Sequence, residues 1–245
     1  MGARWMQWVL VMCMFALALA GVPGCKKKTQ DFVLDQYKKG ERAIAEYDLE
    51  AYKSTLMPET LAAMENELAL AIHASEEEVK KLRPSTMMYV LALRNRQAAA
   101  YLKNMKIDDY VVWLMEQGFL VVDAERDIYP YEVSIAGDTA TVQMGIKVDV
   151  PSSSGGMRFG RRRAGGIIAS ALVPKSKLEP LEGYTLMYRK VNGVWLSDGT
   201  AMAKSVDETI ISAARDEEMR VHEFLVQVEE EAHGSIKASI WSPAK

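Results

Sequence analysis

The chain is poor in the residues that form covalent or metal cross-links. Its 245 residues include only two cysteines, Cys13 and Cys25, and three histidines, far apart at positions 73, 222 and 233. No histidine has a partner at a spacing that compels a metal site. The composition therefore predicts neither a zinc site nor a disulfide-stapled fold, and no metal or other cofactor is expected.

A long apolar run and an excess of one charge are also missing. The apolar run 8–20 has 13 residues, whereas a helix that spans a bilayer needs about 20. Lys and Arg total 30 against 33 Asp and Glu, a net charge of −3, which argues against a nucleic-acid-binding protein. With 49% apolar and 26% charged residues, the chain has a globular composition. We expect one domain with appendages, or two small domains.

The first 25 residues are organised like an export signal. Arg4 supplies a positive charge, no acidic residue precedes Asp31, and small residues follow the apolar run before Cys25. This order is typical of a signal peptide rather than of a membrane span. A plain secretory peptide and a short uncleaved anchor are the alternatives to a signal that ends at Cys25.

The stretch Val22-Pro23-Gly24-Cys25 resembles the lipobox of bacterial lipoproteins. That resemblance implies that the signal peptide 1–24 is removed, that Cys25 carries a diacylglycerol and an acyl chain such as palmitate, and that 25–30 form a lipidated tether. More than one acyl chain is needed for stable anchoring, because each buried methylene contributes only about 0.8 kcal/mol. Lys26 resembles the residue that follows the cysteine in outer-membrane lipoproteins, which implies an outer-membrane anchor facing the periplasm.

The first half of the mature chain has helical patterning. Asp48 is an expected N-cap, Pro58 suits a first helical turn, Ser75 and Glu78 match a capping box, and Gly118 suits a helix end. The expected helices are 30–47, 48–56, 58–72, 75–82, 87–103 and 107–117.

The second half alternates between apolar and polar residues and predicts strands. Gly137-Asp138 and Asn192-Gly193 are the expected turns. A basic loop rich in Gly and Ser is expected over 151–182, then a long C-terminal helix over 201–233 and a loose tail over 234–245, in which Ile236, Ile240 and Trp241 are candidates for docking. The expected strands are 119–122, 129–135, 139–150, 184–191 and 194–197.

Residues 31–200 resemble the NTF2-like (SnoaL-like) superfamily. The resemblance lies in the order of helices followed by an antiparallel sheet, and in the patterns at 45–52, 135–142 and 188–197. The resemblance implies an α+β fold in which N-terminal helices pack on a curved antiparallel sheet. Such a sheet forms a cone with an open mouth, where ligands bind. Some relatives are isomerases or dehydratases that use an Asp with a Tyr, or a His–Asp pair, inside the cone.

Three regions are candidates for function. The cluster Arg158, Arg161, Arg162 and Arg163 suits an anionic membrane surface or envelope polymer, although a flexible solvated tip is the alternative. The helix over 201–233 covers the sheet or forms a homodimer seam. In the cone, catalysis requires an acid with a pKa raised by burial and a tyrosine that donates to an oxyanion, but a solvated turn over 123–127 and rim or core tyrosines are the favoured alternative, so no catalytic residue is assigned. The candidates there are Asp123, Glu125, Asp127, Tyr129, Tyr131, Tyr184 and Tyr188.

The sequence therefore predicts a membrane-anchored envelope lipoprotein that binds a ligand or partner without transforming it. The partners expected are the membrane, through the lipid on Cys25, and an envelope protein or anionic polymer. An enzyme of the isomerase or dehydratase type, and a scaffold subunit of an envelope complex, are the alternatives.

Overall fold

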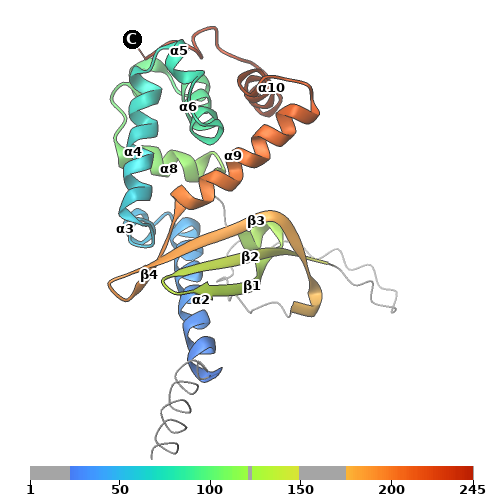
Figure 1. Ribbon diagram of the computed structural model, residues 1–245. Helices are drawn as coiled ribbons and strands as arrows, with labels where there is room; N and C mark the ends of the chain where they lie inside the picture. The colour runs from blue at the N-terminus through green and yellow to red at the C-terminus, as the bar shows by residue number, and fades with distance from the viewer. Residues whose placement is uncertain (1–22, 121–122, 149–174, 245) are drawn as a thin grey trace, which may run out of the picture.

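The computed structural model describes residues 23–120, 123–148 and 175–244. Figure 1 shows a group of helices at one end of the molecule and an antiparallel sheet crossed by helix α2 at the other. The fold class is therefore α+β, as predicted. The elements are α2 (Pro23–Ala45), α3 (Leu49–Lys53), α4 (Pro58–His73), α5 (Glu76–Val79), α6 (Pro84–Arg96), α7 (Ala99–Leu102), α8 (Ile107–Glu116), η1 (Asp123–Arg126), β1 (Ile128–Ala136), β2 (Thr139–Lys147), η2 (Lys175–Lys177), β3 (Leu178–Val191), β4 (Val194–Ser197), α9 (Gly199–Asp216) and α10 (Val221–His233).

The sheet is a four-stranded meander in the order β1-β2-β3-β4, with antiparallel neighbours. Both predicted turns are confirmed. At the second, Asn192 and Gly193 have φ of 50° and 85°, the left-handed pair that a type I′ hairpin requires. Strand β3 starts at Leu178, so the loop expected over 151–182 ends earlier than predicted; residues 151–174 lie outside the described part.

One face of the sheet is buried beneath α2. Val33 and Tyr37 of α2 pack on alternate residues of β2, and Tyr188 and Trp195 complete this cluster. Ala140, Val142 and Met144 are all buried, whereas Thr141 and Gln143 between them are half-exposed. This period of two follows from the pleat of a strand that is covered on one side.

The larger apolar core lies among the helices. Buried side chains from α4, α6 and α8 pack with Ile210 of α9, Leu225 of α10 and Ile240 of the C-terminal tail. A smaller cluster joins this core to α2 and α3, and contains Ala43, Tyr52, Leu56, Val111 and Met115. The connection is reinforced where the N–H of Met57 donates to the Ser197 carbonyl at 2.9 Å and the N–H of Ser197 donates to the Thr55 carbonyl at 2.7 Å.

The prediction of one helix over 201–233 is wrong. The chain forms α9 and α10 instead, with Glu218 at φ 56° between them. The N–H of Met219 donates to the Ala214 carbonyl at 2.8 Å and the N–H of Glu218 to the Arg215 carbonyl at 3.0 Å. These are the two bonds of a Schellman ending. Because glutamate occupies the left-handed position that glycine usually takes, the sequence shows no helix stop here.

Other boundaries also differ from the prediction. The helix expected over 87–103 is divided into α6 and α7 at the extended residues Gln97 and Ala98. Phe119 and Leu120 are not in a strand, and residues 121–122 lie outside the described part. The tail is docked, not loose: Ile240 is buried and the N–H of Ala244 donates to the Ile72 carbonyl at 3.0 Å. No helix in the described ranges has the length and apolar character needed to cross a membrane.

Candidate functional site

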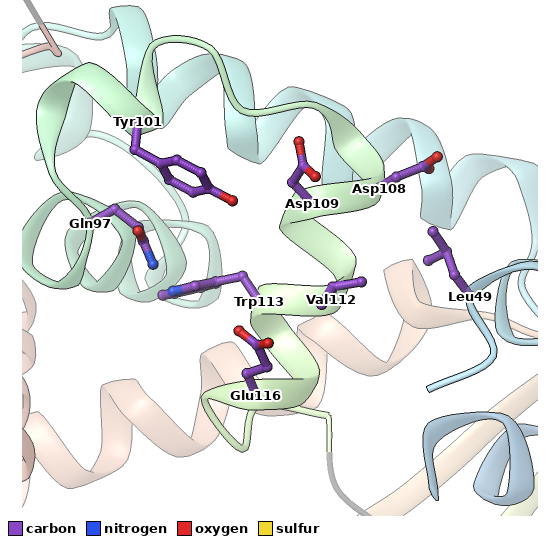
Figure 2. A pocket seen from close by; sticks show the side chains of 8 residues that line it. All are labelled: Leu49, Gln97, Tyr101, Asp108, Asp109, Val112, Trp113 and Glu116. Atoms are coloured by element: carbon purple, nitrogen blue, oxygen red, sulfur yellow. The ribbon is translucent and has the colours of Figure 1, made fainter. Parts of the chain in front are cut away.

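An open cleft of about 460 Å³ lies at the helical end of the molecule (Figure 2). This volume is in the range of small-molecule sites. Helix α8 provides most of the wall, α7 adds Tyr101, Gln97 follows α6, and Leu49 opens α3. The lining residues are Leu49, Gln97, Tyr101, Asp108, Asp109, Val112, Trp113 and Glu116.

Helix α8 presents these side chains because they are spaced by about four residues. Positions 108–109, 112–113 and 116 recur once per turn and therefore share a face. The two aspartates are in the first turn, where the helix dipole favours negative charge. Asp109 also accepts a hydrogen bond from the Lys106 N–H at 3.1 Å, which begins the helix and holds this carboxylate at the cleft.

The cleft carries three carboxylates. Asp108 is paired with Lys53 of α3, whose Nζ lies 3.1 Å from Asp108 Oδ1 and 2.7 Å from Glu50 Oε1. Among the described residues, neither Asp109 nor Glu116 has an ion-pair partner within 4.0 Å, and both side chains are exposed. The cleft therefore has negative charge that is not locally neutralised.

Trp113 lies in the wall of the cleft and is covered by neighbouring aromatic rings. Its ring packs between Tyr110 and Phe119, with centroid distances of 6.0 and 5.5 Å, and the residue is 3% exposed. The indole Nε1 is buried and has no hydrogen-bond partner among the residues that the structure describes. In Figure 2 the nitrogen end of the ring points toward Gln97, another lining residue. A buried donor left unpaired costs about 1–3 kcal/mol, and because this nitrogen is buried it is not accessible to a ligand in the cleft.

A second polar cluster lies between α2, η1 and β3. Asp123 is 4% exposed, and its carboxylate accepts hydrogen bonds from the Tyr184 hydroxyl at 2.7 Å and the Tyr37 hydroxyl at 3.5 Å. Its backbone N–H donates to Glu41 Oε2 at 2.8 Å. Burial raises the pKa of Asp123, although the tyrosine bonds and Arg126 oppose that rise. Burial also raises the pKa of Tyr37 and Tyr184, and nearby carboxylates add to the effect.

The structure brings together only some of the predicted catalytic candidates. Asp123 and Tyr184 are in contact, and Tyr188 is buried in the sheet cluster near them. Glu125 and Asp127 are exposed, and Tyr129 and Tyr131 are half-buried on β1. Tyr37 was missed, because nothing local in α2 relates it to Asp123, 86 positions later. Both carboxylate oxygens of Asp123 already bind tyrosines, so the cluster ties three elements together.

The remaining predicted residues are placed as follows. Arg158, Arg161, Arg162 and Arg163 lie outside the described residues, and Cys25 lies near the start of α2. The histidines do not meet in one site; His222 contacts the edge of Trp241, with ring centroids 6.0 Å apart. Within the described ranges, no group of three or more His, Cys, Asp or Glu side chains is placed to hold a metal ion.

The cleft itself was not predicted from the sequence. The spacing of Asp109, Val112 and Glu116 along one helix face was a usable signal, but it says nothing about Tyr101 or Gln97 opposite. No family model matches the chain, and no curated protein or solved structure matches it either. Its function is therefore inferred from the chemistry of its own residues.

Proposed function

We propose that the protein is a lipid-anchored envelope lipoprotein whose folded part binds a ligand in the cleft without transforming it. The observation that carries this proposal is the cleft, where the exposed ring of Tyr101 lies with the carboxylates of Asp109 and Glu116, which have no ion-pair partner among the described residues. Specific sites combine apolar surface with a few such polar groups. An NTF2-like arrangement is part of the proposal, and the packing of α2 on one face of an antiparallel meander supports it.

The position of the cleft suits a tethered binding protein. Helix α2 starts at Pro23, close to the proposed lipid attachment at Cys25, and runs along the sheet. Its 23 residues span roughly 35 Å at a rise of about 1.5 Å per residue. The helices that form the cleft lie at the end of the molecule away from the start of α2 (Figure 1). A lipid on Cys25 would therefore leave the cleft facing the periplasm.

The anchor is tested by mass spectrometry of the full chain purified from bacterial membranes. We expect the first residue to be Cys25 with a mass increase of a diacylglycerol and one acyl chain. In Cys25→Ser we expect the signal peptide to remain uncleaved, because the thiol that receives the lipid is absent. A wild-type protein that keeps Met1, or that carries a free thiol at Cys25, would contradict the anchor.

Binding in the cleft is tested with a panel of small cationic, neutral and anionic compounds added to the full chain in detergent. Saturation-transfer NMR detects those that bind. Val112→Arg places a long cation in the cleft and should abolish binding at this site. Val206→Arg, on the exposed face of α9, is the matched control and should keep it. If no compound loses its signal in Val112→Arg, the cleft is not a binding site.

An enzyme is the second candidate, and the bond between Asp123 and Tyr184 is the observation that favours it. A buried acid that shares a hydrogen bond with a tyrosine has the groups needed for proton transfer next to a carbonyl. Such an enzyme would lose turnover in both Asp123→Asn and Tyr184→Phe while remaining folded. If the bond between Asp123 and Tyr184 only holds η1 and β3 together, both variants should instead be less stable, which thermal unfolding measures.

A further inference from the structure

We propose that the first turns of α2 bind the surface of the phospholipid bilayer that holds the lipid, with the exposed ring of Phe32 among the headgroups. This inference rests on the proposed function, because it requires the anchor at Cys25. It adds that the folded part itself contacts the bilayer. Three observations support it: the continuity of α2, the exposure of Phe32 and the helix face on which Phe32 lies.

Helix α2 leads from the proposed lipid directly into the folded part. Residues 25–30, which the sequence predicts as a tether, belong to this helix. Val33, only eight positions after Cys25, is already 0% exposed and packs against the sheet. Eight residues of helix span about 12 Å. The sheet and α2 are therefore held close to the bilayer, and the helical group lies at the far end of the molecule (Figure 1).

Phe32 presents an apolar ring to solvent near that surface. The residue is 54% exposed, whereas its neighbour Val33 is buried. Successive residues of a helix are rotated by about 100°, so Phe32 lies beside the row of Val33 and Tyr37 that covers the sheet. A single exposed apolar residue is ordinary on a protein surface. Here its place on the lipid-bearing helix gives it a specific partner, because such rings bind at the boundary between headgroups and acyl chains.

Positions 25 and 32 share one face of α2. They are seven residues apart, which is about two turns and about 10 Å along the axis. Side chains of a helix lean toward its N-terminus, so the ring of Phe32 leans toward the end that carries the lipid. The headgroup layer on each side of a bilayer is roughly 5–8 Å thick. A modest tilt of α2 therefore brings the ring into this layer.

The charges around Phe32 do not select an anionic surface. Lys28, Asp31 and Asp35 are all exposed on the same part of α2. One cation beside two carboxylates gives no net attraction for anionic headgroups. The apolar ring is therefore the main contact, and a bilayer of zwitterionic phospholipid is sufficient as the partner.

Fluorescence quenching by brominated lipids tests this contact. The lipidated full chain is reconstituted into phosphatidylcholine vesicles whose acyl chains carry bromine either near the headgroups or near the bilayer centre. Phe32→Trp places a reporter in the proposed contact. Tyr47→Trp is the matched control, because Tyr47 is 57% exposed and follows the other end of α2, roughly 22 Å farther from the lipid. The signal of the native tryptophans is measured in the wild type and subtracted.

We expect bromine near the headgroups to remove about half or more of the fluorescence that Phe32→Trp adds. Bromine near the bilayer centre should remove less, and neither lipid should quench Tyr47→Trp. Thiol labelling gives a second measurement, since Cys25 is lipidated and an introduced cysteine is then the one free thiol of the mature chain. In vesicles, a charged maleimide should label Phe32→Cys about tenfold more slowly than Tyr47→Cys.

Flotation of the same vesicles distinguishes two failures. If the protein floats with the vesicles but Phe32→Trp is quenched no more than Tyr47→Trp, the anchor stands and the contact of α2 with the bilayer is overturned. Equal labelling of Phe32→Cys and Tyr47→Cys would overturn it as well. If the wild-type protein does not float and its mass shows no lipid, the anchor itself fails, and this inference fails with it.

Discussion

Among single residues, Glu67 combines burial with a titratable charge. It lies on α4, largely covered by neighbouring helices, and its Oε2 accepts a hydrogen bond from the Tyr110 hydroxyl at 3.1 Å. Burial raises its pKa to about 7, while the Tyr110 bond and the nearby Arg83 oppose that rise. Because the pKa of Glu67 is higher in the folded state than in the unfolded state, the folded protein binds one more proton at pH values between these two pKa values. Stability is therefore full at low pH and declines as pH rises through about 7.

Replacing Glu67 with Gln should flatten this dependence. Gln keeps the shape and an acceptor for Tyr110 but never ionises, so Glu67→Gln should be more stable than wild type at pH 8 by roughly 2 kcal/mol. At pH 4 the two should differ little. Urea unfolding at both pH values measures the difference, with the exposed Glu65→Gln as control. Equal gains at both pH values would show that ionisation is not the cause.

At the level of secondary structure elements, Arg94 connects three parts of the helical core. Its guanidinium, in a residue 4% exposed, donates to the carbonyls of Ala71 at 2.8 Å, Leu70 at 3.0 Å and Trp241 at 3.1 Å, and to that of Ala74. Leu70, Ala71 and Ala74 end α4. The Leu70 carbonyl also accepts from the Ala74 N–H at 3.0 Å, whereas the carbonyls of Ala71 and Ala74 have no donor left within the helix. One side chain thus caps α4 from α6 and holds the C-terminal tail.

Removing that guanidinium should destabilise the protein strongly. We expect Arg94→Met to lower the free energy of unfolding by about 3–5 kcal/mol, because it leaves several buried carbonyls unpaired. Arg94→Lys should be intermediate, since an ammonium group cannot reproduce the planar fork. Arg215→Met, at an exposed position of α9, should change little. Urea denaturation measures all three, and a small loss in Arg94→Met would mean that water replaces the guanidinium.

Element boundaries were predictable where a local signal sets them. Asp48 accepts from the Ala51 N–H at 2.9 Å, and Ser75 and Glu78 form the predicted capping box. Gly118, with φ 72°, ends α8 as expected. The break between α9 and α10 was not predictable, because Glu218 takes the left-handed conformation without a sequence signature. There, packing of α10 against α6 selects the turn: Arg96 and Asn95 bind the buried Glu229.

At the scale of the whole molecule, one apolar cluster lies between α2 and the sheet, and another lies among the helices. A third apolar cluster joins these two parts. Leu56 lies in this joining cluster and is 6% exposed. A weaker junction should let the two parts unfold separately, because each retains its own core. The junction therefore determines whether the protein unfolds in one cooperative step.

Leu56→Ala tests this coupling. The cavity should cost about 2–5 kcal/mol and separate the unfolding of the sheet from that of the helices. Hydrogen exchange monitored by mass spectrometry should show β2 and α6 opening together in wild type and at different denaturant concentrations in the variant. Val194→Ala, at a 52% exposed position of β4, should leave them coupled. If β2 and α6 still open together in Leu56→Ala, other contacts couple the two parts.

The sequence by itself determined several helix caps and the hairpins, because each depends on residues within a few positions of one another. The two hairpin turns are examples, since glycine and asparagine tolerate positive φ. Only the tertiary structure decided which distant groups meet. Tyr37 reaches Asp123, Arg94 reaches Trp241, and Tyr101 comes to border a cleft with α8. Such meetings depend on how whole elements pack to bury apolar surface, which no local pattern of residues specifies.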